Sequence, residues 1–403
     1  MKKLSNKFRN PDITEIEKLQ NQGCRCEDWA TFWLSDPLSI NYIFNASFYG
    51  EVFIGSLGKE IIFPGGLRKK SGLYNVTLHN CCIGDNVYIS ETRNHISNYD
   101  ISNDTVIENI NLLIMDGESS FGNGTLVNVL DETGGRQLMI YDRLSAHLAY
   151  IMAFYRHIDH LPDSIEKMIK QYSKNMKTSR GFIGRNCEIR NCNEIINVKI
   201  GDYTRINGAS LLKEGSINSN SYSPVKIGLN TIAENFIISS GAEINNGAII
   251  FNCFVGQGCL LSNNYSATNS LFFSNCQGIN GEACSVFAGP FTVTHHKSTF
   301  LIAGMFSFLN AGSGSIQSNH MYKLGPIHHR IVERGSKTTS DSYLLWPAKI
   351  GPFTLVMGRH YKNSDTSFMP FSYVIEKNDE SWLVPGINLR SVGTIRDAMK
   401  WPR

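Results

Sequence analysis

Residues 227–261 read IGLNTIAENFIISSGAEINNGAIIFNCFVGQGCLL, and an aliphatic residue returns every six positions. The recurring positions are Ile232, Ile238, Ile244 and Ile250, followed after a one-residue slip by Val255 and Leu261. Further units of the same kind begin at Ile83, Ile183 and Ile200. A strand of a β-sandwich alternates with period two, so a sustained period of six indicates a parallel β-helix with one short strand per repeat.

A second position supports this interpretation, because a small or β-branched residue follows each leading aliphatic by four positions. These residues are Val87, Cys187, Thr204, Thr231, Ala242, Ala248 and Cys259. In a triangular coil the aliphatic residue fills the interior, the small residue leaves room for it, and glycine takes the turn conformations. The sequence therefore predicts a mainly β fold, a parallel β-helix of hexapeptide repeats.

One segment breaks the six-residue period. Residues 142–179 place apolar residues at helical three-to-four spacing, and we expect a helical hairpin inserted into the β-helix, with Asp163 as the N-cap of its second helix. The hairpin either packs on the β-helix or serves as an oligomer contact or lid. The expected organisation is a helical cap at 1–40, a first β part at 41–141, the insertion at 142–179, the main β-helix at 180–285 and a histidine-rich continuation at 286–403.

Composition restricts the location and class of the protein. Hydrophobic residues make up 42% and charged residues 18% of the 403, which is typical of a globular chain. No apolar run approaches a membrane span, and the N-terminus lacks the apolar core of a secretory signal, so we expect a cytoplasmic protein without membrane contact. The ten cysteines show no CxxC spacing and are interpreted as small buried residues.

Histidines and basic residues concentrate towards the C-terminus. Six of the eleven histidines lie in the last 120 residues, and residues 285–365 carry eight Lys or Arg against three acidic residues. This density suits a small anionic ligand and is too sparse for nucleic acid. Binding and catalytic sites usually form on loops that a rigid scaffold holds in place.

Several long strings resemble a known family. They are FVGQGC (254–259), GEACSVFAGP (281–290), TVTHHK (292–297), NAGSGS (310–315), SNHMYKLG (318–325) and GRHYKN (358–363). They are similar to a group of uncharacterised bacterial proteins, described as a domain of unknown function and related to hexapeptide-repeat, left-handed β-helix proteins. The resemblance runs from about Leu19 to Arg403, and typical members continue beyond the point where this chain stops.

The resemblance implies a left-handed coil, a homo-oligomer, most simply a trimer, and a similarity to hexapeptide acyltransferases. In such enzymes a histidine acts as general base and deprotonates the acceptor that attacks an acyl thioester. Candidate bases are His296, His320 and His360, of which His320 is favoured because it follows a glycine-rich turn. Candidate ligand-binding residues are Asn319, Lys323, Arg330 and Arg359. Acyl-CoA is the expected co-substrate, and no tightly bound cofactor or metal is expected.

Two other functions stay open at this point. A non-catalytic β-helix module would bind a nucleotide sugar or act as a regulatory subunit, as the related domains of sugar-phosphate nucleotidylyltransferases suggest. A hydration enzyme similar to carbonic anhydrase would need three imidazoles around a metal, although the usual ligand spacing is absent. Three further histidines, His147, His157 and His160, lie on or near the hairpin and are interpreted as structural or solvated.

Overall fold

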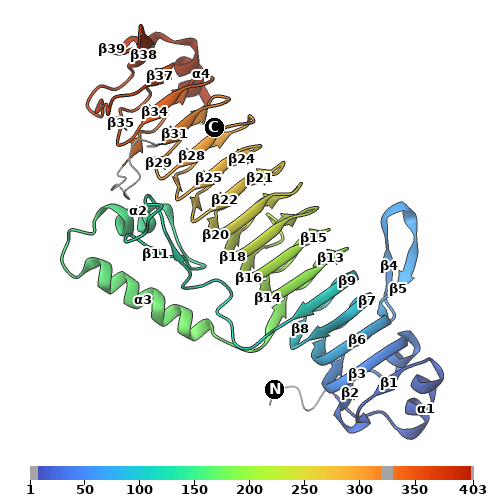
Figure 1. Cartoon of the computed structure of the whole chain (residues 1–403). Helices are drawn as coiled ribbons and strands as arrows, with labels where there is room; N and C mark the ends of the chain where they lie inside the picture. Colours follow the sequence, from blue (N-terminus) through green and yellow to red (C-terminus); the bar gives the residue numbers. More distant parts are fainter. Residues whose placement is uncertain (1–7, 319–329, 401–403) are drawn as a thin grey trace. The chain divides into compact units, whose positions relative to one another are not determined.

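The structure, a computed structural model, describes residues 8–318 and 330–400. The chain forms two compact units. The first contains Met1–Asn123 and Ser173–Gly241, and the second contains Gly124–Tyr172 and Ala242–Arg403. Both units consist mainly of short parallel strands (Figure 1).

The first unit opens with a capped helix and continues as strands. Asp12 accepts a hydrogen bond from the Glu15 N–H and Glu15 accepts one from the Asp12 N–H, so a capping box starts the first helix. Its elements are α1 (Ile13–Asn21), β1 (Arg25–Cys26), η1 (Trp29–Thr31), β2 (Phe32–Leu34), η2 (Pro37–Tyr42), β3 (Ile43–Ile54), β4 (Glu60–Ile62), η3 (Pro64–Gly66), β5 (Arg68–Lys70), β6 (Gly72–Ile83), β7 (Tyr88–Ser97), β8 (Tyr99–Ile101), β9 (Val106–Ile114), β12 (Gly181–Ile183), β13 (Glu188–Arg190), β14 (Glu194–Ile200), β15 (Arg205–Asn207), β16 (Leu211–Asn218), β17 (Lys226–Ile227) and β18 (Ile232–Ser239).

Asparagine side chains bridge the corners of the first unit. Asn109 and Asn191 have positive φ, a conformation that asparagine tolerates better than most residues. The Asn109 side-chain amide donates to Asn191 at 2.8 Å, and Asn191 donates to Asn207 at 2.9 Å. This column of corners is therefore held together by side-chain hydrogen bonds as well as by strand pairing.

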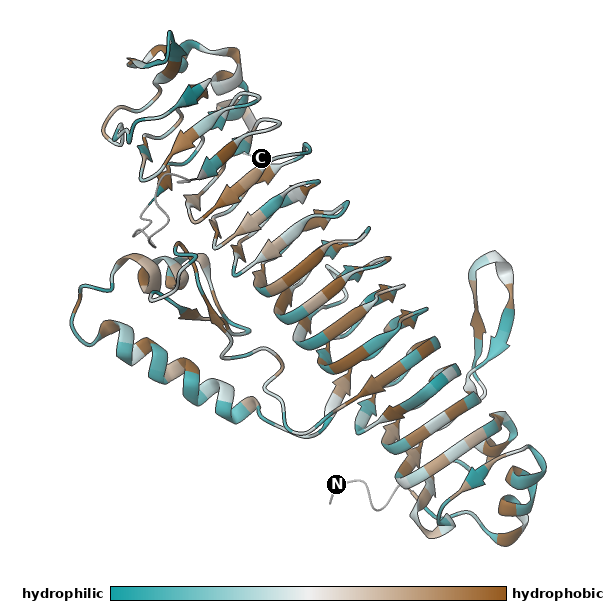
Figure 2. Ribbon diagram, in the orientation of Figure 1, coloured by the Kyte–Doolittle hydropathy of each residue, from teal (hydrophilic) through white to brown (hydrophobic). Residues whose placement is uncertain are grey.

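The predicted insertion leaves the coils after β9 and returns at β12, which pairs in parallel with β8. It contains the antiparallel pair β10 (Leu126–Val127) and β11 (Leu138–Met139) and the helices α2 (Ala146–Phe154) and α3 (Leu161–Met176). Helix α3 begins at Leu161, so Asp163 lies in its first turn and the prediction of Asp163 as N-cap is wrong. Figure 2 shows α2 as largely apolar, whereas polar and apolar residues alternate along α3.

The second unit repeats a coil of three strands. Each strand from β22 to β34 pairs in parallel with the third strand after it, as in the column β24–β27–β30–β33–β36, so three such columns form the faces of the coil. Its further elements are β19 (Glu243–Ile244), β20 (Ile249–Val255), β21 (Leu260–Ser262), β22 (Ser266–Thr268), β23 (Leu271–Phe272), β24 (Gln277–Ile279), β25 (Glu282–Cys284), β26 (Phe287–Ala288), β27 (Val293–Thr294), β28 (Phe300–Ile302), β29 (Met305–Phe306), β30 (Asn310–Ala311), β31 (Ile316–Ser318), β32 (Ile331–Val332), β33 (Lys337–Thr338), β34 (Tyr343–Leu345), β35 (Lys349–Ile350), β36 (Leu355–Met357), β37 (Arg359–His360), the antiparallel hairpin β38 (Tyr373–Lys377) and β39 (Glu380–Val384), η4 (Ile387–Arg390) and α4 (Val392–Lys400).

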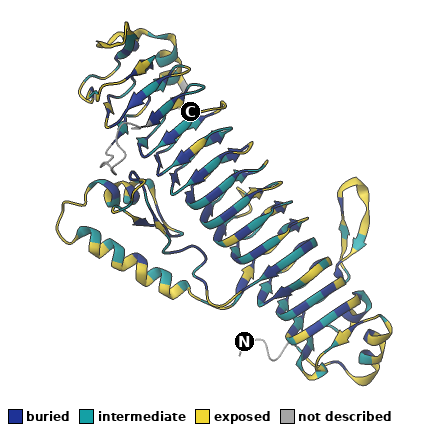
Figure 3. Cartoon of the chain, viewed as in Figure 1, coloured by how far each residue is buried: buried dark blue, intermediate teal, exposed yellow. Residues whose placement is uncertain are grey.

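The repeat positions form the interior of the coils. Ile244 and Ile250 are fully buried, and so are the small residues that follow the leading aliphatics, including Ala242 and Thr231. Figure 3 shows buried residues alternating with partly buried ones along many of the strands. The mainly β, parallel-sheet fold is thereby confirmed. Within the described part of the chain, no helix is both long enough and apolar enough to cross a membrane.

Candidate functional site

Helix α2 covers an apolar column on the outer face of the second unit. Phe254, Leu271 and Phe287 lie in register on β20, β23 and β26, and all three are buried. The rings of Tyr150 and Phe154 on α2 both lie 6.5 Å from the Phe287 ring. The apolar sequence of α2 is explained by this contact, because both the helix and the outer column remove apolar surface from water.

A groove of about 840 Å³, here called the α2 groove, lies between α2 and the coil. One wall carries His147, Tyr150 and Tyr155, and the opposite wall includes Phe291 and Arg334. Burial, with smaller effects of Tyr155 and Glu333, raises the pKa of Tyr150. A mostly apolar groove with a few polar groups and this volume is typical of a small-molecule site.

Phenylalanine occupies one corner of successive coils. The Phe308 N–H donates to the Pro290 carbonyl, the Gly335 N–H to the Ser307 carbonyl, and the Phe353 N–H to the Arg334 carbonyl. Four rings belong to this corner column: Phe291, Phe308, Phe353 and Phe371, each at positive φ. Gly335 takes the place of a ring between Phe308 and Phe353, and a Cβ on Gly335 would lie 2.4 Å from the Phe353 ring.

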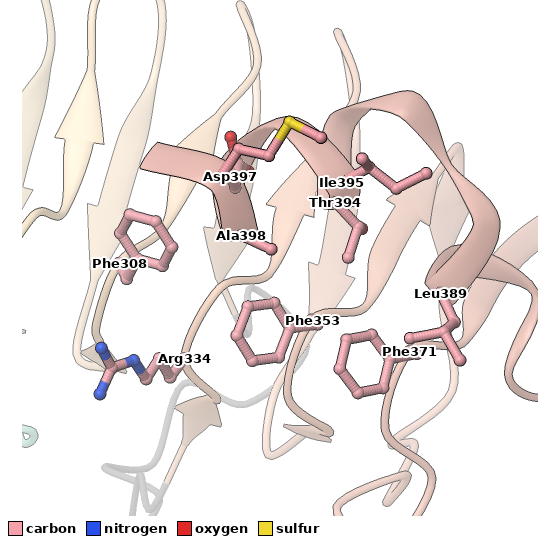
Figure 4. Close-up of a pocket in the computed structure, with 10 residues that line it drawn as sticks. Phe308, Arg334, Phe353, Phe371, Leu389, Thr394, Ile395, Asp397 and Ala398 are labelled. Atoms are coloured by element: carbon pink, nitrogen blue, oxygen red, sulfur yellow. The ribbon is translucent and has the colours of Figure 1, made fainter. Parts of the chain in front are cut away.

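A second groove, here called the α4 groove, has a volume of about 860 Å³ and lies between α4 and the corner column. In Figure 4 the rings of Phe308, Phe353 and Phe371 form a row facing α4, and Ala398 points towards them. The Phe353 and Phe371 rings are stacked, with centroids 4.9 Å apart and planes inclined by 9°. Aromatic rings thus form much of the floor of the α4 groove.

Arg334 lines both grooves, and so does Phe308. The guanidinium lies at the end of the row of rings in Figure 4 and is the cationic side chain common to the two linings. Arg334 itself is exposed to solvent. A planar guanidinium with five donors binds carboxylates and phosphates in a bidentate manner, so this position favours an anionic group.

The predicted histidines do not form one cluster among the described residues. His296 is exposed and follows β27, whereas His360 lies on β37, three coils further along the column β28–β31–β34–β37. At the usual strand spacing that separation is roughly 14 Å. His320, with Asn319 and Lys323, lies outside the described residues.

His360 has the surroundings of a structural histidine. It is 1% exposed, its Nε2 lies 3.1 Å from the Met357 carbonyl, and its Nδ1 lies 2.8 Å from the Ser381 hydroxyl. A carbonyl only accepts, so Nε2 carries the hydrogen and Nδ1 accepts from Ser381. Burial lowers the pKa of His360, which keeps the imidazole neutral near pH 7.

The two described arginines of the predicted site lie in different surroundings. Arg330 is 1% exposed, and its guanidinium lies 5.0 Å from the centre of the Trp346 ring. Burial lowers the pKa of Arg330 to about 9 against the opposing effects of Glu132, Tyr343 and Asp131, so the side chain stays protonated at neutral pH. Arg359, by contrast, is exposed on β37.

No group of three His, Cys, Asp or Glu side chains within residues 8–318 and 330–400 is placed to hold a metal ion. The hydration-enzyme hypothesis therefore gains no support from the described geometry.

The grooves contain residues that sequence reasoning did not select. His147 was interpreted as structural or solvated, yet it lines the α2 groove. Arg334 is one of the eight basic residues of segment 285–365, but the sequence does not single it out as a ligand-binding residue. One signal was present in the sequence, because Phe291 and Phe308 are 17 residues apart, and Phe353 and Phe371 are 18 apart, which is the length of one coil.

The fold and the paired grooves define a coiled parallel-β protein with a ligand-sized apolar site. The chain belongs to the family described as "Domain of unknown function (DUF4954)", whose model matches residues 8–403. It is also 27% identical over 401 residues to an "Uncharacterized protein" of Treponema pallidum (strain Nichols). That match covers 92% of this chain and 52% of the relative, so the chain spans about half the length of that relative.

Proposed function

We propose that the second unit binds an amphipathic anion of the acyl-CoA class in the two grooves that meet at Arg334. The observation that carries this proposal is the position of Arg334 on the lining of both apolar grooves. Acyl-CoA combines phosphates, which need a cation, with an arm and an acyl group that need apolar surface. The proposal makes the protein an acyl-CoA-binding β-helix module.

The aromatic wall of the α2 groove supports the same class of ligand. Tyr150, Tyr155 and Phe291 present rings on which an adenine base or a pantetheine arm would pack. Ser307 supplies a hydroxyl within the same lining. A nucleotide sugar would share the phosphates and the base but would place a hydroxyl-rich sugar against apolar walls, which costs free energy.

Isothermal titration calorimetry with CoA, acetyl-CoA and a nucleotide sugar tests this function. CoA and acetyl-CoA are expected to bind, and Arg334→Gln is expected to weaken their binding by about 10- to 100-fold through loss of charge-assisted hydrogen bonds. Arg359→Gln is the matched control, because Arg359 is exposed and lies outside both linings. Absence of CoA binding, or an equal effect of both variants, would contradict the proposal.

A second candidate function is acyl transfer, with acyl-CoA as donor. It is favoured by the presence of His147, an exposed imidazole, on the lining of the α2 groove. In this scheme His147 takes a proton from the acceptor, whose oxygen or nitrogen attacks the thioester carbon, and CoA leaves as the thiol. Turnover abolished by His147→Gln with acyl-CoA affinity unchanged would support the scheme, and turnover lost only in His320→Ala would assign the base to the residue favoured from the sequence.

We infer from the resemblance that the coils wind left-handed as in hexapeptide-repeat proteins and that the chain forms a cytoplasmic homotrimer. Sedimentation equilibrium at micromolar concentration tests the oligomer, and a monomer or dimer would contradict it.

A further inference from the structure

The α4 groove has two walls that are fixed to each other by polar contacts outside its apolar lining. The Asn388 side-chain amide donates to the Phe353 carbonyl at 2.5 Å, and the Asn388 N–H donates to the Phe371 carbonyl at 2.8 Å. The Lys337 ammonium lies 2.5 Å from Asp397 on α4. These contacts hold α4 opposite the corner column, so the groove is a built feature of the end of the second unit.

The lining of the α4 groove is almost entirely apolar. The residues that form it are Phe308, Phe353, Phe371, Leu389, Ile395, Ala398 and Met399, together with Thr394, Asp397 and Arg334. Asp397 is engaged by Lys337, and Arg334 lies at the end of the row of rings. A sugar or a phosphate would find few hydrogen-bond partners along this lining, whereas an alkyl chain needs none.

We propose that the α4 groove holds the alkyl chain of a long-chain acyl group, with the anionic part of the ligand at Arg334 and in the α2 groove. This inference rests on the proposed function and narrows it from acyl-CoA in general to long-chain acyl-CoA. Phe308 and Arg334 line both grooves, so the two grooves adjoin at the point where the proposed chain meets the headgroup. Arg334 is the one Lys or Arg among the described lining residues of the α4 groove, and the row of Phe rings extends away from it.

Chain length gives the quantitative expectation. Each methylene that leaves water strengthens binding roughly fourfold, so an acyl chain that buries only four methylenes gains on the order of a hundredfold. Palmitoyl-CoA is therefore expected to bind at least about a hundredfold more tightly than acetyl-CoA. Short-chain esters are expected to bind through the α2 groove and Arg334 alone.

The test measures the dissociation constants of acetyl-CoA, palmitoyl-CoA and free palmitate, below the concentrations at which they aggregate, with the full chain and two variants. Ala398→Trp fills the α4 groove from an exposed helix position that points at the rings. Val392→Trp is the matched control, because Val392 is 83% exposed on the same helix and lies outside the lining. Circular dichroism and melting temperature establish that each variant is folded.

Loss of most of the palmitoyl-CoA preference in Ala398→Trp, with acetyl-CoA affinity unchanged and Val392→Trp like the parent chain, is the expected result. Equal affinity for the two esters would overturn the inference and leave the proposed function standing. A chain-length preference that Ala398→Trp does not reduce would also overturn it. Palmitate binding that is sensitive to Ala398→Trp, without binding of any CoA ester, would keep the chain site and overturn the proposed function.

Discussion

The Lys337 ammonium on β33 lies 2.5 Å from a carboxylate oxygen of Asp397 on α4. The two side chains are only 25% and 17% exposed. The pair joins the last helix to β33, which is followed in its column by β36 and β38, and Asp397 lies on the lining of the α4 groove. Its partial burial distinguishes it from the Lys349–Asp365 pair, in which the side chains are 50% and 54% exposed at 3.8 Å.

Replacing Lys337 by Met is expected to lower the free energy of unfolding by about 1–3 kcal/mol, because Asp397 loses a partly buried charged partner. The control, Lys349→Met, should change it by less than about 0.5 kcal/mol, as is usual for exposed pairs. Chemical denaturation followed by circular dichroism measures both. Equal effects of the two substitutions would show that the Lys337–Asp397 pair does not anchor α4.

Gly335→Ala is expected to destabilise the second unit more than Gly386→Ala. Both glycines have positive φ, at 79° and 70°, so both substitutions carry a backbone penalty of about 1 kcal/mol or more. A Cβ at Gly335 would also lie 2.4 Å from two Phe353 ring atoms, whereas at Gly386 it would meet nothing within 4 Å. Melting temperatures compare the two variants, and addition of Phe353→Leu should recover part of the loss only in Gly335→Ala.

The buried imidazole of His360 predicts a loss of stability in mild acid. Its pKa in the folded protein lies below the ordinary value of 6.5, so the unfolded chain binds the proton more readily. The free energy of unfolding therefore decreases as the pH falls below about 6.5 towards the folded-state pKa. His360→Gln, which retains a donor and an acceptor, should flatten this dependence in denaturation measured from pH 7.5 to 5. An unchanged slope would show that His360 does not contribute to it.

Ile250→Ala tests the interior of the repeat. The side chain is fully buried, and its truncation should cost roughly 2–5 kcal/mol through lost burial and the cavity that remains. The neighbouring Ile249 is only partly buried, so Ile249→Ala should cost clearly less. Urea denaturation of both variants provides the comparison, and a cost at Ile250 below that at Ile249 would contradict the assignment of the interior face.

Local features of the fold were predictable from the sequence, whereas the site was not. Asp12 and Glu15 are three residues apart, and their reciprocal hydrogen bonds depend on little beyond the first helical turn. The N-cap prediction at Asp163 places the start of α3 three residues too late, since Pro162 and Asp163 are both acceptable in a first turn. His147 and Arg334 line one groove although 187 positions separate them, and no local pattern encodes that proximity.

The mainly β fold with parallel strands was predictable from the sequence, because aliphatic residues at a regular spacing, with small residues at a fixed offset, restrict which side chains point inwards. The sequence also marked the basic, histidine-rich segment as the region for a site. Which of those residues lie close together depends on how the coils stack. His296 and His360 are kept apart because each coil adds about 4.8 Å along the stack. The inserted helix α2 packs on the apolar column at Phe287 and so places His147 on the same groove lining as Arg334.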